Sequence, residues 1–210
     1  MANDKFSIKE ALKYGWDSFK ANAPFFVGLM VVMGILTIVP DAIAERLFEP
    51  KSAGLIIVKL LLRLVGLLLG MATTRISLDI YDTGKPNLSI LSELLPQAPS
   101  YIAGKVIYGL IVLVGLILLI VPGIIVAYMF LYVGYLIIDR NLGPIVALQE
   151  SRVLTDGYKL DLFLFSLVVA GINLLGVLCV FIGLFVTIPV TLMASAYVYR
   201  KLAPAEAAAA

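Results

Sequence analysis

Two cations inside an otherwise apolar run, Lys59 and Arg63, are the residues best placed to bind a ligand at membrane depth. They lie one helical turn apart, on the same face of a predicted helix. A lysine or arginine at the centre of a bilayer costs about 2.5–3.5 kcal/mol on insertion scales, so such a cation is a functional candidate. The preceding segment offers acidic partners, namely Asp41, Glu45 and Glu49. The pair predicts a pocket for an anion or a lipid headgroup, or else two side chains that snorkel to the interface.

The side chains on which most hydrolytic and metal-dependent enzymes rely are missing from this chain. It contains no histidine, and its one cysteine, Cys179, lies in an apolar run. A Ser-His-Asp triad, a Cys-His pair and an imidazole metal site are therefore excluded. The apolar runs also lack a pair of aspartates and a Ser-Lys pair. We expect no catalytic residue, no metal, no cofactor and no enzymatic activity.

The amino-acid composition indicates that the helices carrying these two cations lie in a membrane. Of 210 residues, 61% are hydrophobic and 14% are charged, and the mean hydropathy is +1.04. A soluble chain is about 45–50% apolar and about 25% charged, so we predict an integral membrane protein. The net charge of +2 is small and no basic stretch is interleaved with aromatic residues. The expected partners are membrane lipids and possibly another membrane protein, with no nucleic acid.

Run lengths predict the number of membrane spans, because a bilayer core of about 30 Å needs roughly 20 helical residues. Residues 106–138 and 162–199 contain no charged side chain and are too long for one span each. Each is predicted to form a hairpin. The predicted helix breaks are Pro122 with Gly123, and Gly183 with Pro189 beyond it.

The resulting fold class is all-α, a polytopic membrane protein with six transmembrane helices arranged as three hairpins. Its single domain covers residues 1–203. The predicted spans are about 21–40, 53–76, 100–121, 123–138, 160–182 and 184–200. With both termini cytoplasmic, twelve of the sixteen lysines and arginines lie inside and two, Arg46 and Lys51, lie outside. This asymmetry predicts a multi-pass protein of the plasma membrane with its N- and C-termini in the cytoplasm.

Residues 7–20 predict an interfacial amphipathic helix. Its apolar face contains Ile8, Leu12, Gly15, Trp16 and Phe19, and its polar face contains Lys9, Lys13, Asp17 and Lys20. Ser7 and Glu10 have the spacing of a capping box, which predicts a start at Ile8. A tryptophan flanked by lysines suits the headgroup layer, which makes Trp16, Lys13 and Lys20 candidate interface residues. Docking of this helix on the protein's own cytoplasmic face is the alternative.

Three short amphipathic segments share one layout, each preceding a predicted hairpin on the cytoplasmic side. They begin near Phe6, Leu88 and Gly143. Residues 204–210 form an alanine-rich end that we expect to be a disordered tail.

Two further groups of charges extend the candidate cytoplasmic interface. Arg75 and Asp79 have the spacing of a surface ion pair at the end of the second span. Arg152 and Lys159 lie in a connector of mixed charge before the fifth span. Such a connector either docks a partner or is simply solvated.

Residues 84–210 resemble a group of uncharacterised bacterial six-helix membrane proteins, related to the membrane domain attached to some glycerophosphodiester phosphodiesterases. The resemblance rests on Pro122-Gly123-Ile124-Ile125 followed by Asp139, on Ser151 and Gly157, and on Pro189 with Tyr197. It implies an architecture of six spans and no established reaction. No catalytic residue is carried over, and the chain has no polar stretch long enough for the phosphodiesterase barrel.

Two functions from different classes fit these observations. The first is a non-enzymatic accessory protein that binds lipid headgroups or a membrane partner through its cytoplasmic segments. The alternative is a small transporter or lipid translocator in which Arg63 contacts an anionic substrate between helices.

Overall fold

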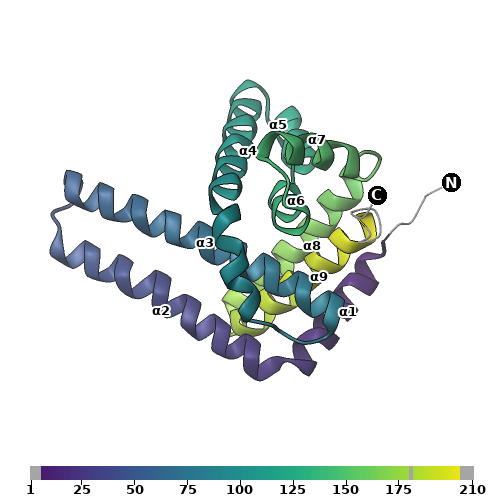
Figure 1. The fold of residues 1–210 in the computed structure, drawn as a ribbon, viewed down its shortest axis with the longest axis horizontal. Helices are drawn as coiled ribbons and strands as arrows, with labels where there is room; N and C mark the ends of the chain where they lie inside the picture. The colour runs from purple at the N-terminus through teal and green to yellow at the C-terminus, as the bar shows by residue number, and fades with distance from the viewer. Residues whose placement is uncertain (1–5, 180–181, 204–210) are drawn as a thin grey trace.

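The structure, a computed structural model, describes residues 6–179 and 182–203, and within these ranges it contains helices and no strand (Figure 1). The predicted tail, 204–210, lies outside the described residues. The helices are α1 (Ile8–Ala21), α2 (Ala23–Leu47), α3 (Ala53–Thr83), the 3-10 helix η1 (Ser89–Gln97), α4 (Ala98–Leu118), α5 (Ile120–Met129), α6 (Val133–Arg140), α7 (Pro144–Leu154), α8 (Lys159–Leu178) and α9 (Leu184–Leu202).

Five helical segments of the described chain are long and apolar enough to cross a membrane. They are Ala23–Leu47, Ala53–Thr83, Ser92–Leu118, Ile120–Arg140 and Lys159–Leu178. This supports an all-α membrane protein. The sixth predicted span corresponds to α9, which is not in this set because its last turn contains Arg200 and Lys201. Ten residues of α9 are buried, so this helix lies at the centre of the protein.

The first hairpin is longer than the predicted spans 21–40 and 53–76. Pro40, predicted to end the first span, lies inside α2, which continues to Leu47. A proline removes one backbone hydrogen bond, and the good helix formers in 42–47 continue the helix after it. Similarly, α3 continues to Thr83 and ends at Gly84, which has the left-handed φ of 79° typical of a helix C-terminus.

The turn between α4 and α5 does not lie at Pro122 and Gly123, so that prediction is wrong. Leu119 is the extended residue that separates the two helices, with φ −158° and ψ 135°. Pro122 lies in the first turn of α5, where a missing N–H breaks no helical hydrogen bond. Gly123 provides close contact instead, because a Cβ added there would lie 2.6 Å from the Leu116 backbone nitrogen.

The predicted span 123–138 is interrupted between α5, which ends at Met129, and α6, which begins at Val133. Side chains of α7 satisfy backbone groups that this break exposes. Ser151 accepts a hydrogen bond from the Tyr132 N–H at 3.2 Å and donates one to the Met129 carbonyl at 3.1 Å. Thr155 also donates to the Met129 carbonyl. The break is therefore specified by contacts from a distant helix.

The other two predicted breaks lie in the last hairpin. Gly183 is the N-cap of α9 and packs against Gly176, since a Cβ at Gly183 would lie 2.7 Å from the Gly176 Cα. Pro189 lies inside α9 and is buried. Only Gly183 marks the end of a helix.

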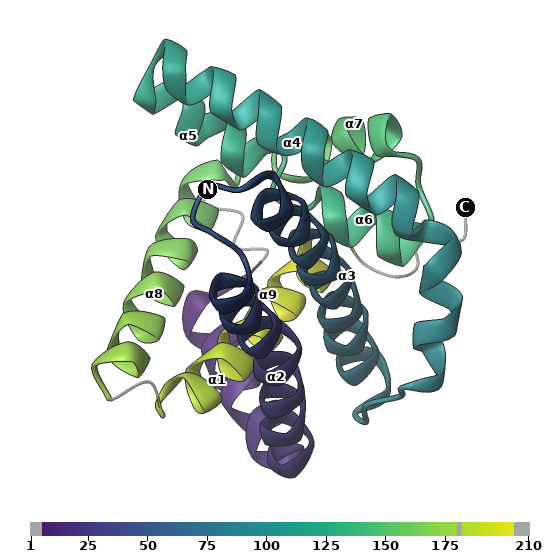
Figure 2. The same cartoon turned by 90° about the vertical axis from the view of Figure 1, so that its left-hand side faces the viewer.

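Each amphipathic segment packs on the returning helix of a hairpin. α1 contacts α9, η1 contacts α3, and α7 contacts α6. The pairs α2–α3, α4–α5 and α8–α9 are also in contact. The α2–α3 and α4–α5 hairpins project in different directions from the region where these segments meet (Figures 1 and 2).

The two projecting hairpins expose apolar side chains along their length, as lipid-facing helices do. Examples are Ile38 (69% exposed), Leu60 (61%) and Ile117 (75%). Large buried side chains gather instead where the short amphipathic segments meet the returning helices, including Tyr199, Leu136 and Met71. Specific packing is therefore concentrated at one end of the molecule.

Candidate functional site

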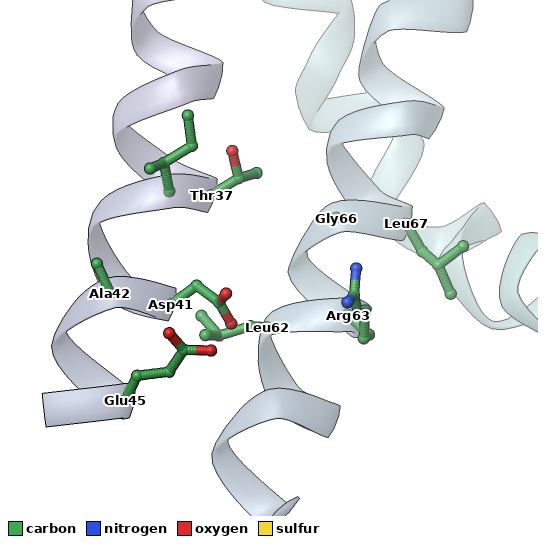
Figure 3. A pocket seen from close by; sticks show the side chains of 9 residues that line it. Thr37, Asp41, Ala42, Glu45, Leu62, Arg63, Gly66 and Leu67 are labelled. Atoms are coloured by element: carbon green, nitrogen blue, oxygen red, sulfur yellow. The ribbon is translucent and has the colours of Figure 1, made fainter. Parts of the chain in front are cut away.

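A pocket opens between α2 and α3, near the loop that joins them, and contains two of the three predicted acidic partners and one of the two cations (Figure 3). It has a volume of about 550 Å³, within the range of ligand pockets. Its lining residues are Thr37, Ile38, Asp41, Ala42, Glu45, Leu62, Arg63, Gly66 and Leu67. We call this site the α2–α3 pocket.

The charges in and beside this pocket are not all neutralised by one another. Lys59, just outside the lining, forms an ion pair with Glu45 at 2.7 Å. None of the ion pairs among residues 6–179 and 182–203 includes Arg63 or Asp41. Asp41 and Glu45 extend from α2 towards α3, where Arg63 lies opposite them (Figure 3). The pocket therefore presents a cation and a carboxylate that face a shared space without contact.

Helix length places this pocket in the part of the α2–α3 hairpin farther from α1. α2 has 25 residues and is about 37 Å long, more than the hydrocarbon core of about 30 Å. Asp41 lies about 27 Å along α2 from Ala23. Arg63 is exposed and lies about 15 Å into α3 from Ala53. It is therefore at the same end of the hairpin as Asp41.

A second group of charges, which we call the inner ion cluster, lies around the buried Arg200 at the opposite end of α3. Arg200 of α9 donates from Nη1 to Asp139 Oδ2 of α6 at 2.7 Å, and from Nη2 to Asp82 of α3. Tyr199 donates its hydroxyl to Asp139 at 2.8 Å. The Arg200 side chain is 7% exposed and that of Asp139 is 9% exposed. This cluster joins the returning helices of all three hairpins.

The inner ion cluster does not follow from the run lengths and helical patterns of the sequence. Asp82, Asp139 and Arg200 each lie in the last turns of a returning helix, directly after Tyr81, Ile138 and Tyr199. The sequence has three units, each an amphipathic segment followed by a predicted hairpin. These three positions correspond when the ends of the units are compared as well as their beginnings. The first two of these positions are aspartates and the third is an arginine. Opposite charges at corresponding helix ends are the signal for an ion cluster where those ends meet.

The predicted interfacial helix, α1, packs on α9 through its small residues. Ala11, Gly15 and Phe19 are buried, whereas Trp16 is 46% exposed. Lys20 lies 5.7 Å from the centre of the Trp16 ring and forms an ion pair with Asp17. That ion pair lowers the pKa of Asp17. Ser7 is the N-cap, as predicted, but its side chain makes no capping hydrogen bond, so the predicted capping box is absent.

Docking on α9 leaves one side of α1 open. Lys13 is exposed, as are Trp16 and Lys20. The open side of α1 therefore has the tryptophan and two lysines that the sequence indicated for a headgroup contact.

The two remaining candidate groups are Arg75 with Asp79 in α3, and Arg152 with Lys159 near the connector between α7 and α8. Arg75 and Asp79 form no ion pair within the described residues, and Asp79 Oδ2 is buried without a hydrogen-bond partner. The predicted surface pair is therefore wrong, because α3 continues past this point and is covered by other helices. In the connector, Lys159 pairs with Asp156 at 2.9 Å and lowers the pKa of that carboxyl. Arg152 is exposed.

Comparison with known proteins identifies a family and no specific activity. A family model described as a protein of unknown function (DUF975) matches residues 46–206. No curated protein and no solved structure gives a significant match. The match confirms the expectation of an uncharacterised family and does not bear on a relation to the membrane domain of glycerophosphodiester phosphodiesterases. Because the matched region is more than half of the chain, the protein belongs to this family of unknown function (DUF975).

Proposed function

We propose that this protein is a non-enzymatic accessory protein of the plasma membrane that binds anionic lipid headgroups on its cytoplasmic side. Both termini lie in the cytoplasm in this proposal. The observation that carries it is the open side of α1, where Trp16 and Lys20 are exposed next to the start of α2. α2 begins at Ala23, two residues after α1 ends, so this side lies at the edge of the membrane.

The chemistry of this surface suits phosphatidylglycerol or a similar anionic lipid. A tryptophan ring prefers the boundary between headgroups and acyl chains, and each lysine near an anionic leaflet contributes about 1 kcal/mol. Exposed apolar side chains on other cytoplasmic segments extend the same contact, among them Leu95 (69% exposed) of η1 and Val153 (73%) of α7. A protein seated in this way organises lipid or positions a neighbouring membrane protein without a reaction of its own.

The single tryptophan of the chain, Trp16, allows a direct test. The purified full-length protein is reconstituted into phosphatidylcholine vesicles that contain phosphatidylglycerol. Bromine atoms are placed on the shallow part of the acyl chains of either lipid, at equal mole fraction. We expect brominated phosphatidylglycerol to quench Trp16 fluorescence more strongly than brominated phosphatidylcholine does, because Lys13 and Lys20 enrich the anionic lipid around α1.

Matched variants separate this contact from general attraction by a cationic protein. Lys13→Gln with Lys20→Gln should remove the difference between the two quenchers. Arg46→Gln with Lys51→Gln, which removes the same charge at the opposite end of the molecule, should leave it unchanged. Equal quenching by both lipids in the unmodified protein, or no quenching at all, contradicts the proposal.

A further inference from the structure

We infer that the α2–α3 pocket is a second and separate lipid site, specific for a zwitterionic headgroup that combines a phosphate with a primary ammonium, as in phosphatidylethanolamine. The inference is independent of the proposed headgroup contact at α1, because it concerns different residues at the other end of the same hairpin.

The pairing of charges around the pocket selects the class of ligand. Glu45 already neutralises Lys59 at 2.7 Å, which leaves Arg63 and Asp41 without an ion pair to any residue that the structure describes. A guanidinium in an apolar environment is costly unless an anion accepts its hydrogen bonds, and a carboxylate likewise requires a donor or a cation. A ligand with one phosphate and one ammonium satisfies both groups at once.

The presence of both positive and negative side chains in the pocket argues against a purely anionic ligand. Asp41 lies in the same pocket as Arg63, so an anion attracted by the arginine also meets the carboxylate of Asp41. Phosphatidylglycerol offers no cation to Asp41. Phosphatidylcholine offers a quaternary ammonium that has no N–H to donate. Phosphatidylethanolamine alone among these three lipids supplies both a phosphate for Arg63 and hydrogen-bond donors for Asp41.

The position and shape of the pocket also suit a lipid rather than a free solute. The site lies in the outer half of the predicted membrane, where Asp41 is about 27 Å along α2 from Ala23. Apolar side chains, Ile38, Leu62 and Leu67, line it beside the charges. Gly66 leaves open space on the α3 wall, because a Cβ added there would meet no atom within 4 Å. A headgroup therefore binds between the charges while the acyl chains follow the exposed apolar faces of the hairpin.

Native mass spectrometry of the full-length protein tests this site. Protein extracted in a mild detergent is incubated with an equimolar mixture of phosphatidylethanolamine, phosphatidylglycerol and phosphatidylcholine of identical acyl chains. We expect preferential retention of one phosphatidylethanolamine. Arg63→Gln should reduce that retention roughly tenfold, the change that corresponds to about 1.4 kcal/mol. Asp41→Asn should abolish the preference for phosphatidylethanolamine over phosphatidylglycerol while some phosphate binding persists.

Two control variants change residues at the tip of the same hairpin but outside the pocket. Each removes one charge of the same sign as the corresponding pocket variant. Arg46→Gln and Glu49→Gln should retain phosphatidylethanolamine as the unmodified protein does. Thermal melting of each variant confirms that the fold is intact. Equal retention of the three lipids would show that Arg63 only snorkels to any phosphate and would overturn the inference. Retention of soluble glycerophosphoethanolamine in place of the lipid would overturn the assignment to a lipid.

Discussion

Arg200 and Asp139 form a hydrogen-bonded ion pair of 2.7 Å that joins the end of α9 to the end of α6. Both side chains are almost completely buried, and Arg200 also bonds Asp82 at the end of α3. A buried ion pair contributes little net stability compared with apolar packing, but removal of one partner leaves an uncompensated charge. The inner ion cluster therefore fixes how the three returning helices meet.

The first prediction concerns this cluster. Arg200→Met should lower the free energy of unfolding by about 3–5 kcal/mol, because the Asp139 carboxylate then stays buried without its cation. Unfolding by sodium dodecyl sulfate in bicelles, followed by circular dichroism, measures the change. The neighbouring Lys201→Met is the matched control, since Lys201 is exposed, and it should cost less than about 1 kcal/mol.

A second experiment on the same cluster separates charge from packing. Asp82→Asn and Asp139→Asn, combined with Arg200→Met, should regain much of the lost stability because no buried charge remains. If Arg200→Met alone unfolds at the same detergent fraction as the unmodified protein, the cluster does not hold the helices together.

The second prediction concerns the docking of α1. A Cβ at Gly15 would collide with the carbonyl oxygen of Val190 in α9. Gly15→Ala should therefore lower stability by about 1–3 kcal/mol through overpacking, measured as a lower melting temperature in detergent. Gly28→Ala in α2 is the control, because a Cβ there meets nothing within 4 Å. Equal melting temperatures for the two variants would show that α1 is not docked on α9.

The third prediction concerns the break between α5 and α6. Ser151→Ala removes the acceptor of the Tyr132 N–H and one donor to Met129, which should cost about 1–3 kcal/mol. Chemical unfolding in detergent measures this loss. Ser195→Ala is the control, because the Ser195 hydroxyl donates its hydrogen bond to the Thr191 carbonyl of its own helix. A loss no greater than that of the control would mean that α7 does not specify the break.

The fourth prediction tests the orientation in the membrane. In a background with Cys179→Ala, cysteines at Lys51, Leu119 and Ile182 should react with a membrane-impermeant maleimide on intact cells. A cysteine at Lys85, after α3, should react only after the membrane is permeabilised. Leu119 and Ile182 are 64% and 73% exposed at the ends of their hairpins. Labelling of Lys85→Cys on intact cells would reverse the proposed topology.

Local sequence was sufficient for most of the helices. The start of α1 at Ile8, the turn before α9 at Gly183 and the start of α7 after Gly143 follow from glycine, proline and polarity patterns that act within a few residues. The same local reasoning was wrong at Pro40 and Pro122. A proline can be accommodated within a helix or in its first turn, and local sequence alone does not distinguish these positions from a helix end.

Composition and the lengths of the apolar runs are enough to identify an apolar, helical membrane protein that contains no histidine, because they are read directly from the sequence. Only the tertiary structure decided the partners of the charges. Lys59 pairs with Glu45, and Arg200 pairs with Asp82 and Asp139, over separations of 14, 118 and 61 residues. Such partners depend on how whole helices pack, and helical periodicity carries no information about which distant helix a given face will meet.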